Sequence, residues 1–130
     1  MLRRTLLATG LLAVPGIARA QGSHSHSHAP GPNGGLIGEV GTRHVELVAR
    51  DGELRIYVLD DQDKQVTARG ATGSAVVQAG GRQQTIRLEA APEDAFLVGR
   101  GDFTARGARV VATLTLPGQP QRSVRFPFVP

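Results

Sequence analysis

Four histidines are the side chains of this 130-residue chain with the clearest capacity for chemistry. His24, His26 and His28 alternate with serines in one short tract, and His44 follows later in the sequence. Neutral imidazole is a good ligand for Cu(II), Zn(II) and Ni(II). Because the chain has no cysteine, a metal site would have to use histidine, carboxylate, methionine or backbone atoms. The pattern predicts that these four histidines bind a divalent transition metal ion, copper or zinc.

The spacing of the tract determines what kind of site it could form. In an extended strand, alternate residues lie about 7 Å apart, which is too far for two imidazoles to share one ion through bonds of about 2 Å. The tract must therefore bend around the metal, which favours capture or buffering over a permanent structural site. His44 is expected on a strand, on the same face as Glu46, where it would be a fixed ligand. The alternatives are a solvated His/Ser spacer and a half-exposed His44 that binds nothing.

Other functional classes find little support in the sequence. Without cysteine there is no thiol nucleophile, and no Gly-x-Ser-x-Gly motif is present, so we expect that the protein is not an enzyme. The sequence contains no basic stripe with interleaved aromatic residues, so nothing in it suggests nucleic-acid binding. The acidic run from Asp60 to Asp63 fails the EF-hand spacing rule and is expected to be a solvated turn.

Residues 1–20 are typical of an export signal. Arg3-Arg4 precedes an apolar run over residues 5–17, and Ala18-Arg19-Ala20 fits a signal-peptidase site. The two arginines also resemble a twin-arginine signal, so both export routes stay open. We expect a periplasmic or secreted protein that keeps no membrane span after cleavage.

Cleavage after Ala20 changes the charge of the protein. The 15 Lys and Arg residues fall to 12 when Arg3, Arg4 and Arg19 leave, while all 11 acidic residues stay. The net charge therefore falls from +4 to about +1 with histidines neutral. The high pI of the full chain therefore owes much to the signal segment and to the use of arginine as the main basic residue.

The remaining chain divides into a linker and one domain. Residues 21–35 are rich in Ser, His, Gly and Pro without apolar periodicity, and are expected to be flexible. Residues 36–130 alternate between apolar and polar positions and are interrupted by turn residues, which predicts short strands.

Two hairpins follow from this pattern. Asp51-Gly52 is typical of a type I′ turn and would join strands over 43–49 and 53–59, pairing Leu47 with Ile56 on an apolar face. Gly80-Gly81 would join strands over 74–79 and 82–88. Two further strands are expected over 109–116 and 123–128. An odd loop length between them brings their apolar faces together, with Ala112 or Leu114 opposite Val124.

These elements add up to seven or eight short antiparallel strands. The predicted fold is all-β, an immunoglobulin-like antiparallel β-sandwich, with a small closed barrel as the alternative. No segment has the pattern of an amphipathic helix.

Several segments resemble small bacterial periplasmic proteins that are similar to the N-terminal extension of periplasmic adaptor subunits in heavy-metal efflux systems of the resistance–nodulation–division type. The resemblance covers roughly residues 24–128 and is carried by His28 to Gly35, His44 to Val48, Tyr57 to Asp61, Lys64 to Val66, Val110 to Leu116, and Arg125-Phe126. It implies a β domain associated with copper or zinc resistance, with His28 and His44 as the matching histidines.

The resemblance also suggests partners. The 130 residues contain no coiled-coil hairpin or lipoyl-like domain, so it implies an accessory protein that works beside efflux adaptor or transporter components. The competing hypothesis is a metal-indifferent β-sandwich interaction module whose His/Ser segment is only a linker.

Overall fold

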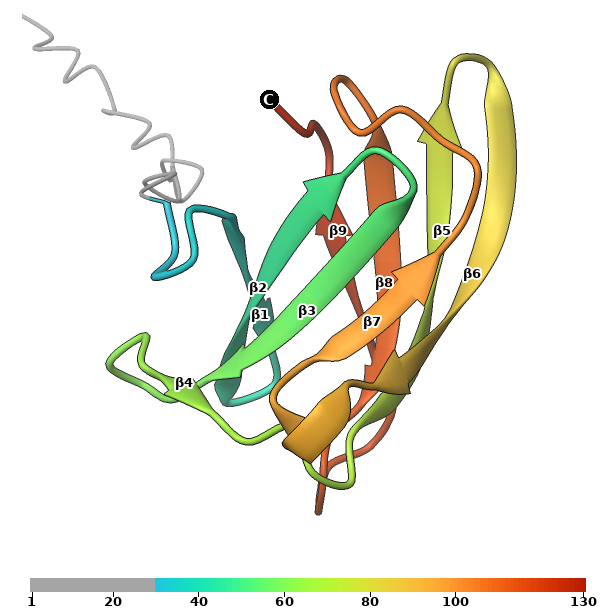
Figure 1. Cartoon of the computed structure of the whole chain (residues 1–130). Helices are drawn as coiled ribbons and strands as arrows, with labels where there is room; N and C mark the ends of the chain where they lie inside the picture. The colour runs from blue at the N-terminus through green and yellow to red at the C-terminus, as the bar shows by residue number, and fades with distance from the viewer. Residues whose placement is uncertain (1–29) are drawn as a thin grey trace, which may run out of the picture.

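The computed structural model describes residues 30–130 (Figure 1). The predicted signal segment 1–20 and the histidines His24, His26 and His28 lie outside the described residues. The described part is all-β and antiparallel, which confirms the predicted fold class, and its one helical element is a short 3-10 turn. The elements are β1 (Leu36–Val40), β2 (Arg43–Arg50), β3 (Glu53–Leu59), β4 (Gln65–Val66), β5 (Thr72–Ala79), β6 (Arg82–Ala90), η1 (Pro92–Asp94), β7 (Leu97–Arg100), β8 (Arg109–Thr115) and β9 (Arg122–Phe126).

The β2–β3 hairpin has the predicted register. Arg50 pairs with Glu53, and Leu47 pairs with Ile56 on the buried face. The predicted type I′ turn is wrong, however, because only Gly52 has a positive φ, of 76°. The Asp51 carboxylate instead accepts the N–H of Ala105 at 2.8 Å, so a loop from the other end of the chain packs onto the turn.

The other predicted strand pairs are also present. β5 and β6 pair across Gly80-Gly81, both with positive φ, and Ala75 lies opposite Ile86. β8 pairs with β9 so that Ala112 faces Val124, which is one of the two registers predicted from an odd loop. The small strand β4 was not predicted; it pairs with the end of β3.

The strands form two layers that are joined at one side. Their order is β1-β2-β3-β7-β6-β5-β8-β9, with β4 beside β3. In Figure 1, β2, β3 and β7 form the front layer, and β5, β8 and β9 lie behind them. β6 pairs with β5 along most of its length and with β7 through its last two residues, so it links the layers. The sandwich is therefore close to the barrel alternative.

Strands β1 and β9, the two ends of the strand order, pack against each other without forming a strand pair. A Cβ atom at Gly38 would lie 2.5 Å from Cγ2 of Val124 and 3.1 Å from the Phe126 ring. Glycine at this position lets the two end strands pack closely through side chains, although no ladder of hydrogen bonds joins them.

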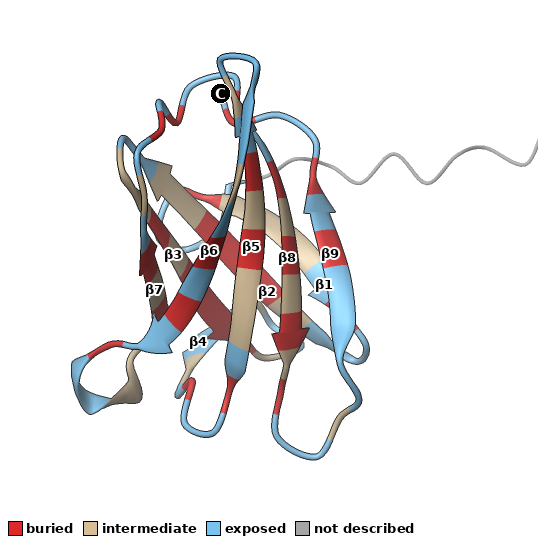
Figure 2. Cartoon of the chain, turned by 90° about the vertical axis from the view of Figure 1, so that its right-hand side faces the viewer, coloured by how far each residue is buried: buried red, intermediate tan, exposed pale blue. Residues whose placement is uncertain are grey.

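The space between the layers is filled mainly by aliphatic side chains, with Phe103 and Phe126 among them. Figure 2 shows buried positions alternating with intermediate ones along β5 and β8, and with exposed ones along β6 and β9. The largest fully buried apolar side chains are Leu47, Leu54, Ile56, Leu59, Leu97 and Leu114.

Among residues 30–130, no helix has the length and hydrophobicity needed to cross a membrane.

Candidate functional site

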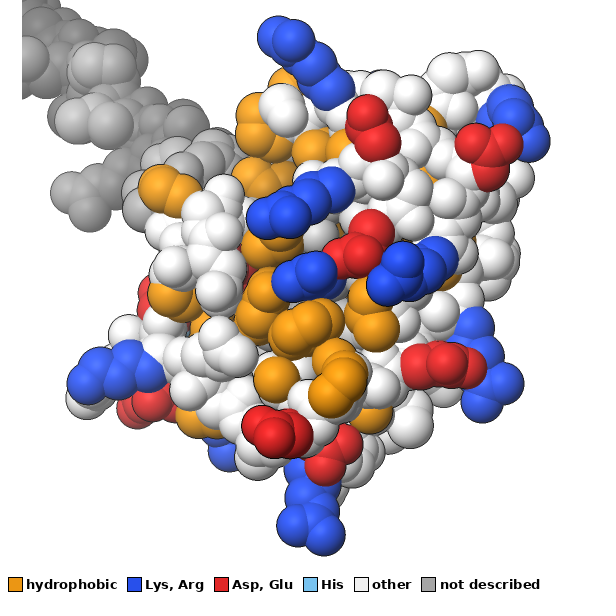
Figure 3. Space-filling model, viewed as in Figure 1, with side chains coloured by type: hydrophobic (Ala, Val, Ile, Leu, Met, Phe, Trp, Pro, Cys, Tyr) orange, Lys and Arg blue, Asp and Glu red, His pale blue; other side chains and the backbone are white. Residues whose placement is uncertain are grey.

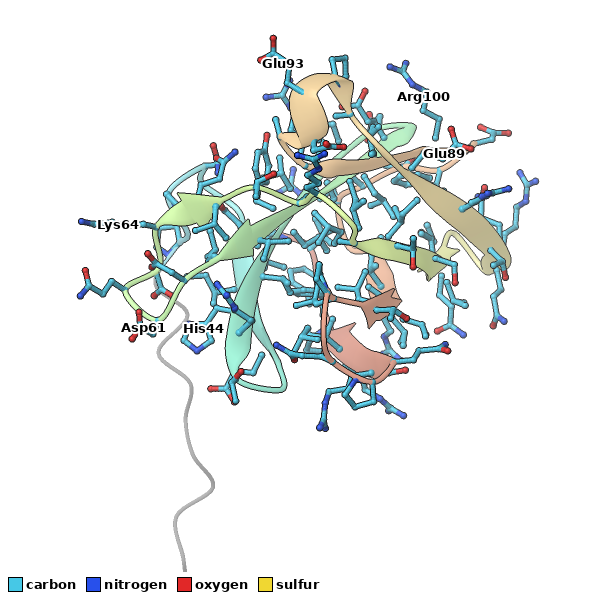
Figure 4. The ribbon with its side chains drawn as sticks, turned by 90° about the horizontal axis from the view of Figure 1, so that it is seen from below. His44, Asp61, Lys64, Glu89, Glu93 and Arg100 are labelled. Carbon is cyan, nitrogen blue, oxygen red and sulfur yellow. The ribbon has the colours of Figure 1, made fainter. Side chains whose placement is uncertain are left out.

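His44 lies near the start of β2, on the outer face of the front layer. It pairs with Leu59 of β3 on one side and with Glu39 of β1 on the other. Its side chain is 33% exposed, so it is partly held and partly open to solvent. Figure 4 shows His44 beside the turn that carries Asp61 and Lys64.

Two carboxylates flank the His44 imidazole. Nδ1 donates a hydrogen bond to Oδ1 of Asp63 at 2.5 Å, and Nε2 lies 3.9 Å from Oε1 of Glu39. A carboxylate that accepts a hydrogen bond from the N–H of one ring nitrogen fixes the tautomer of the imidazole. The other ring nitrogen is then free to act as a ligand. This carboxylate–imidazole arrangement is the usual support of a metal-binding histidine. The same contacts would also suit a protonated imidazole that pairs with both acids.

The turn that carries Asp63 is built by Asp60. The Asp60 carboxylate accepts the backbone N–H groups of Gln62 and Lys64, both at 2.9 Å. These hydrogen bonds hold the pKa of Asp60 below its ordinary value, and the bond from Lys64 has the largest effect. Burial of the carboxyl acts in the opposite direction. Asp63 has a φ of 57°, in the left-handed region that Asp and Asn tolerate better than most residues. The acidic run is thus the predicted turn, and one of its carboxylates reaches His44.

Glu46 is the one polar or charged residue that is buried in the described part of the chain, with no exposed surface. Its carboxylate accepts the backbone N–H of Asn33 at 2.9 and 3.1 Å, Nδ2 of Asn33 at 2.9 Å, and the N–H of Gly35 at 2.7 Å. The hypothesis that Glu46 and His44 share a strand face is consistent with the register. Glu46 is occupied by the segment before β1, however, and is not an open ligand.

The segment before β1 is a tight turn. The N–H of Gly34 donates to the carbonyl of Gly31 at 2.9 Å, with Pro32 and Asn33 at the two central positions. Proline is favoured at the first of these positions because its φ is already suitable. Residues 31–35 belong to the predicted linker, and here they are bonded to β2.

The predicted metal site can be compared with the described residues only at His44. Among residues 30–130, no group of three His, Asp or Glu side chains has its donor atoms placed to hold a metal ion. Two ligand atoms about 2.1 Å from a tetrahedral ion are about 3.4 Å apart. The 3.9 Å between Nε2 of His44 and Oε1 of Glu39 is close to that value, and Glu39 is 64% exposed and free to adjust. Only His44 of the four predicted histidines can be placed.

The contacts of His44 with Glu39 and Asp63 were not predicted from the sequence. Glu39 pairs with His44 because a two-residue turn joins the end of β1 to the start of β2. Asp63 reaches His44 because the turn after β3 folds back beside β2. The clustering of Asp60, Asp61 and Asp63 directly after the strand that pairs with His44 was the one available signal.

A second cluster lies farther along the same outer face. The Arg55 guanidinium lies 4.8 Å from the centre of the Phe96 ring, which also packs against Tyr57 with ring centres 5.1 Å apart. Arg55 also bonds to Glu53, and Nη2 of Arg100 lies 3.6 Å from Oε2 of Glu53. Figure 3 shows hydrophobic side chains with basic side chains among them on this face.

No protein-family model, curated protein or solved structure matches this chain.

Proposed function

We propose that the protein is an exported, periplasmic accessory protein that captures a copper- or zinc-type divalent ion. His24, His26 and His28 supply imidazole ligands from the N-terminal segment, and His44 supplies one from the sandwich. The observation that carries the proposal is the hydrogen bond of 2.5 Å from Nδ1 of His44 to Asp63, which leaves Nε2 available.

The covalent chain is short enough to unite the two halves. Gly31 packs against the Glu46 side chain, as a Cβ atom there would lie 2.4 Å from Cδ of Glu46. Glu46 and His44 are alternate residues of one strand, so their Cα atoms are about 7 Å apart. His28 precedes Gly31 by three residues, which span at most about 11 Å. His28 can therefore reach the His44 imidazole without any change in the sandwich.

The ligand set suits borderline and not hard metal ions. Imidazole binds Cu(II), Zn(II) and Ni(II), whereas Ca²⁺ and Mg²⁺ prefer oxygen ligands. A site completed by a chain segment pays an ordering cost when the ion binds. This favours reversible capture or buffering, which is the role expected beside heavy-metal efflux components. Genes for efflux adaptor or transporter subunits next to this gene would support that connection.

Calorimetric titration of the mature chain from Gln21 with Cu(II) and Zn(II) tests the proposal. We expect a dissociation constant in the micromolar range or tighter, which corresponds to about −8 kcal/mol or more favourable. Replacing His24, His26 and His28 by alanine should abolish this binding. The matched control replaces Ser23, Ser25 and Ser27 by alanine, which alters the same segment and keeps every imidazole. Equal binding by the two triple variants, or none by the parent chain, would reject metal capture.

The alternative is a metal-indifferent interaction module, and the cluster around Phe96 is the observation that favours it. Phe96 is half-buried between Tyr57 and Arg55, and the neighbouring Val98 is also partly exposed. Aromatic and arginine side chains are enriched in protein interfaces. If Phe96→Ala abolished binding of an efflux adaptor subunit while metal binding stayed absent, this alternative would replace the first.

A further inference from the structure

Asn33 is the only asparagine among the 130 residues, and Gly34 follows it. Asparagine followed by glycine is especially prone to deamidation, because glycine has no side chain to shield its backbone nitrogen from the neighbouring amide. Both residues are exposed. Apart from the adjoining residues, no atom of residues 30–130 lies within 4 Å of the place where a Cβ atom of Gly34 would be. Water can therefore reach this peptide bond.

The reaction needs water as its only co-reactant. The backbone nitrogen of Gly34 bonds to Cγ of Asn33, the Cγ–Nδ2 bond breaks, and Nδ2 leaves as ammonia with the proton of the Gly34 N–H. Water then opens the cyclic imide. Cleavage between Cγ and the Gly34 nitrogen gives aspartate, and cleavage between the main-chain carbonyl carbon and that nitrogen gives isoaspartate. Either product replaces an amide, which donates hydrogen bonds, by a carboxylate, which only accepts them.

The fold engages both reacting groups of this pair. The N–H of Gly34 donates to the carbonyl of Gly31 at 2.9 Å. Nδ2 of Asn33 donates to Oε1 of Glu46 at 2.9 Å, and the Asn33 backbone N–H donates to the same carboxylate. The attacking nitrogen and the leaving group are thus each bonded to an acceptor. The pair must give up these hydrogen bonds before the imide can form.

The surroundings of Nδ2 require a group that can donate two hydrogens. Oε1 of Glu46 lies 2.9 Å from Nδ2 of Asn33, and Oε1 of Gln65 lies 3.3 Å from it. The Gln65 amide is held in this orientation because its Nε2 donates to the carbonyl of Ala95 at 3.2 Å. A carboxylate in place of the Asn33 amide would therefore face two acceptors and could donate to neither.

The burial of Glu46 makes this replacement unfavourable. Glu46 has no exposed surface, and no Lys, Arg or His among residues 30–130 lies within ion-pair distance of it. Every hydrogen bond given to its carboxylate within these residues comes from Asn33 and Gly35. A charge shielded from water depends on its donors, and a second carboxylate beside it adds repulsion.

We propose that Asn33 is a deamidation site that the bonds to Glu46 hold unreactive while the domain is folded. An unfolded chain lacks this protection. Conversion to aspartate or isoaspartate then leaves a carboxylate that the folded arrangement does not accommodate. The modification accumulates in chains that have unfolded and makes their return to the native fold less favourable. It requires no metal ion and is independent of metal capture.

Peptide mapping by tandem mass spectrometry follows the reaction at neutral pH in the mature chain from Gln21. We expect Asn33 to deamidate in the guanidinium-unfolded chain and at least about 10-fold more slowly in the folded chain, because losing even one hydrogen bond to a charged group lowers the reactive population by that order. Folded Glu46→Gln should react faster than the folded parent, whereas the matched control Glu89→Gln, at an exposed glutamate of β6, should not.

Three results of this experiment would overturn the proposal. Equal rates in the folded and the unfolded parent would show that the fold gives no protection. Absence of deamidation in both would show that Asn33 is not a modification site. Equal rates in E46Q and E89Q would remove Glu46 from the mechanism.

Asn33→Asp supplies one of the two products directly and tests its effect on the fold. We expect its urea midpoint to lie below that of the parent chain. The matched control Gln121→Glu adds the same charge at an exposed residue and should leave the midpoint unchanged. Equal midpoints of the two variants would show that the product fits the fold and would overturn the proposed consequence. If E46Q does not fold, the rates in the folded and unfolded parent and the midpoint of N33D still decide the proposal.

Discussion

The Asp63 carboxylate decides which nitrogen of His44 is free. Because Nδ1 donates to Asp63, the lone pair of a neutral imidazole is at Nε2, on the side of Glu39. His44 was predicted from the sequence as the fixed ligand, but its orientation was not. The orientation depends on a turn residue with a φ of 57°, and local sequence does not reveal which side chain such a residue will meet.

Asp63→Asn tests this support directly. Asparagine tolerates the left-handed backbone and still accepts a hydrogen bond, so the main change is the loss of negative charge behind the imidazole. Supporting groups of this kind are typically worth 10- to 100-fold in metal affinity. We expect Cu(II) or Zn(II) affinity measured by calorimetry to fall about 10-fold. Asp61→Asn, in the same turn, should have no effect, and equal losses in the two variants would point to net charge alone.

Glu53 provides a prediction about pH. The hydrogen bond from Arg55 holds the pKa of Glu53 below its ordinary value, and the charges of Arg55, Arg100 and Arg50 act in the same direction. A lowered pKa in the folded state contributes stability above the unfolded pKa of about 4.3, and this contribution is lost as pH falls through the lower folded value.

The expected consequence is that Glu53→Gln destabilises the fold at pH 7 more than at pH 3. The urea midpoints of the parent chain and of Glu53→Gln at pH 7 and pH 3 measure this effect. The difference between the two midpoints should be smaller at pH 3 than at pH 7. Added salt should also reduce the difference in urea midpoint at pH 7, because these charged groups are near the surface. A gap that is constant from pH 7 to pH 3 would show that Glu53 acts by packing.

Among the elements, the β2–β3 hairpin was the most predictable. Its register follows from strict alternation on both strands and from a two-residue turn, since a slip by one residue would expose the whole apolar face. The turn type was wrong because Asp51 is bonded to Ala105, which is distant in sequence. The burial of Glu46 was missed for a similar reason. Alternation places it on the outer face, and only the folding back of residues 31–35 covers it.

The seam between β1 and β9 gives a prediction at this scale. No ladder of hydrogen bonds joins these strands, so their contact depends on the space left by Gly38. Gly38→Ala would place a methyl group 2.5 Å from Cγ2 of Val124. Overpacking of this kind typically costs about 1–3 kcal/mol, which urea unfolding would measure.

A double-mutant cycle isolates that contact. Val124→Ala removes the atom that Gly38→Ala would strike, so the double variant should be less destabilised than the sum of the single variants, by at least about 0.5 kcal/mol. Additive effects would show that the seam opens freely, and that packing between β1 and β9 does not hold the two layers closed.

At the scale of the whole molecule, the proposed metal capture allows two arrangements: binding by the N-terminal segment alone, or by the segment and the sandwich together. A ligand stabilises a fold only to the extent that it binds the folded state better than the unfolded state. Histidines in a segment that binds metal alone would bind equally well in both states. A site that includes His44 in its Asp63-supported orientation exists only when the sandwich is folded.

Thermal unfolding with and without Zn(II) therefore distinguishes the two arrangements. At a free concentration 100 times the dissociation constant, a site confined to the folded state adds about 2.7 kcal/mol to the free energy of unfolding, which raises the Tm of a domain of this size by roughly 10–20 °C. We expect this rise in the mature chain, its reversal by a chelator and its absence with Mg²⁺. His44→Ala should bind Zn(II) more weakly and show little or no rise. A parent chain that binds Zn(II) tightly with an unchanged Tm would place the whole site in the N-terminal segment and leave the sandwich without a part in metal capture.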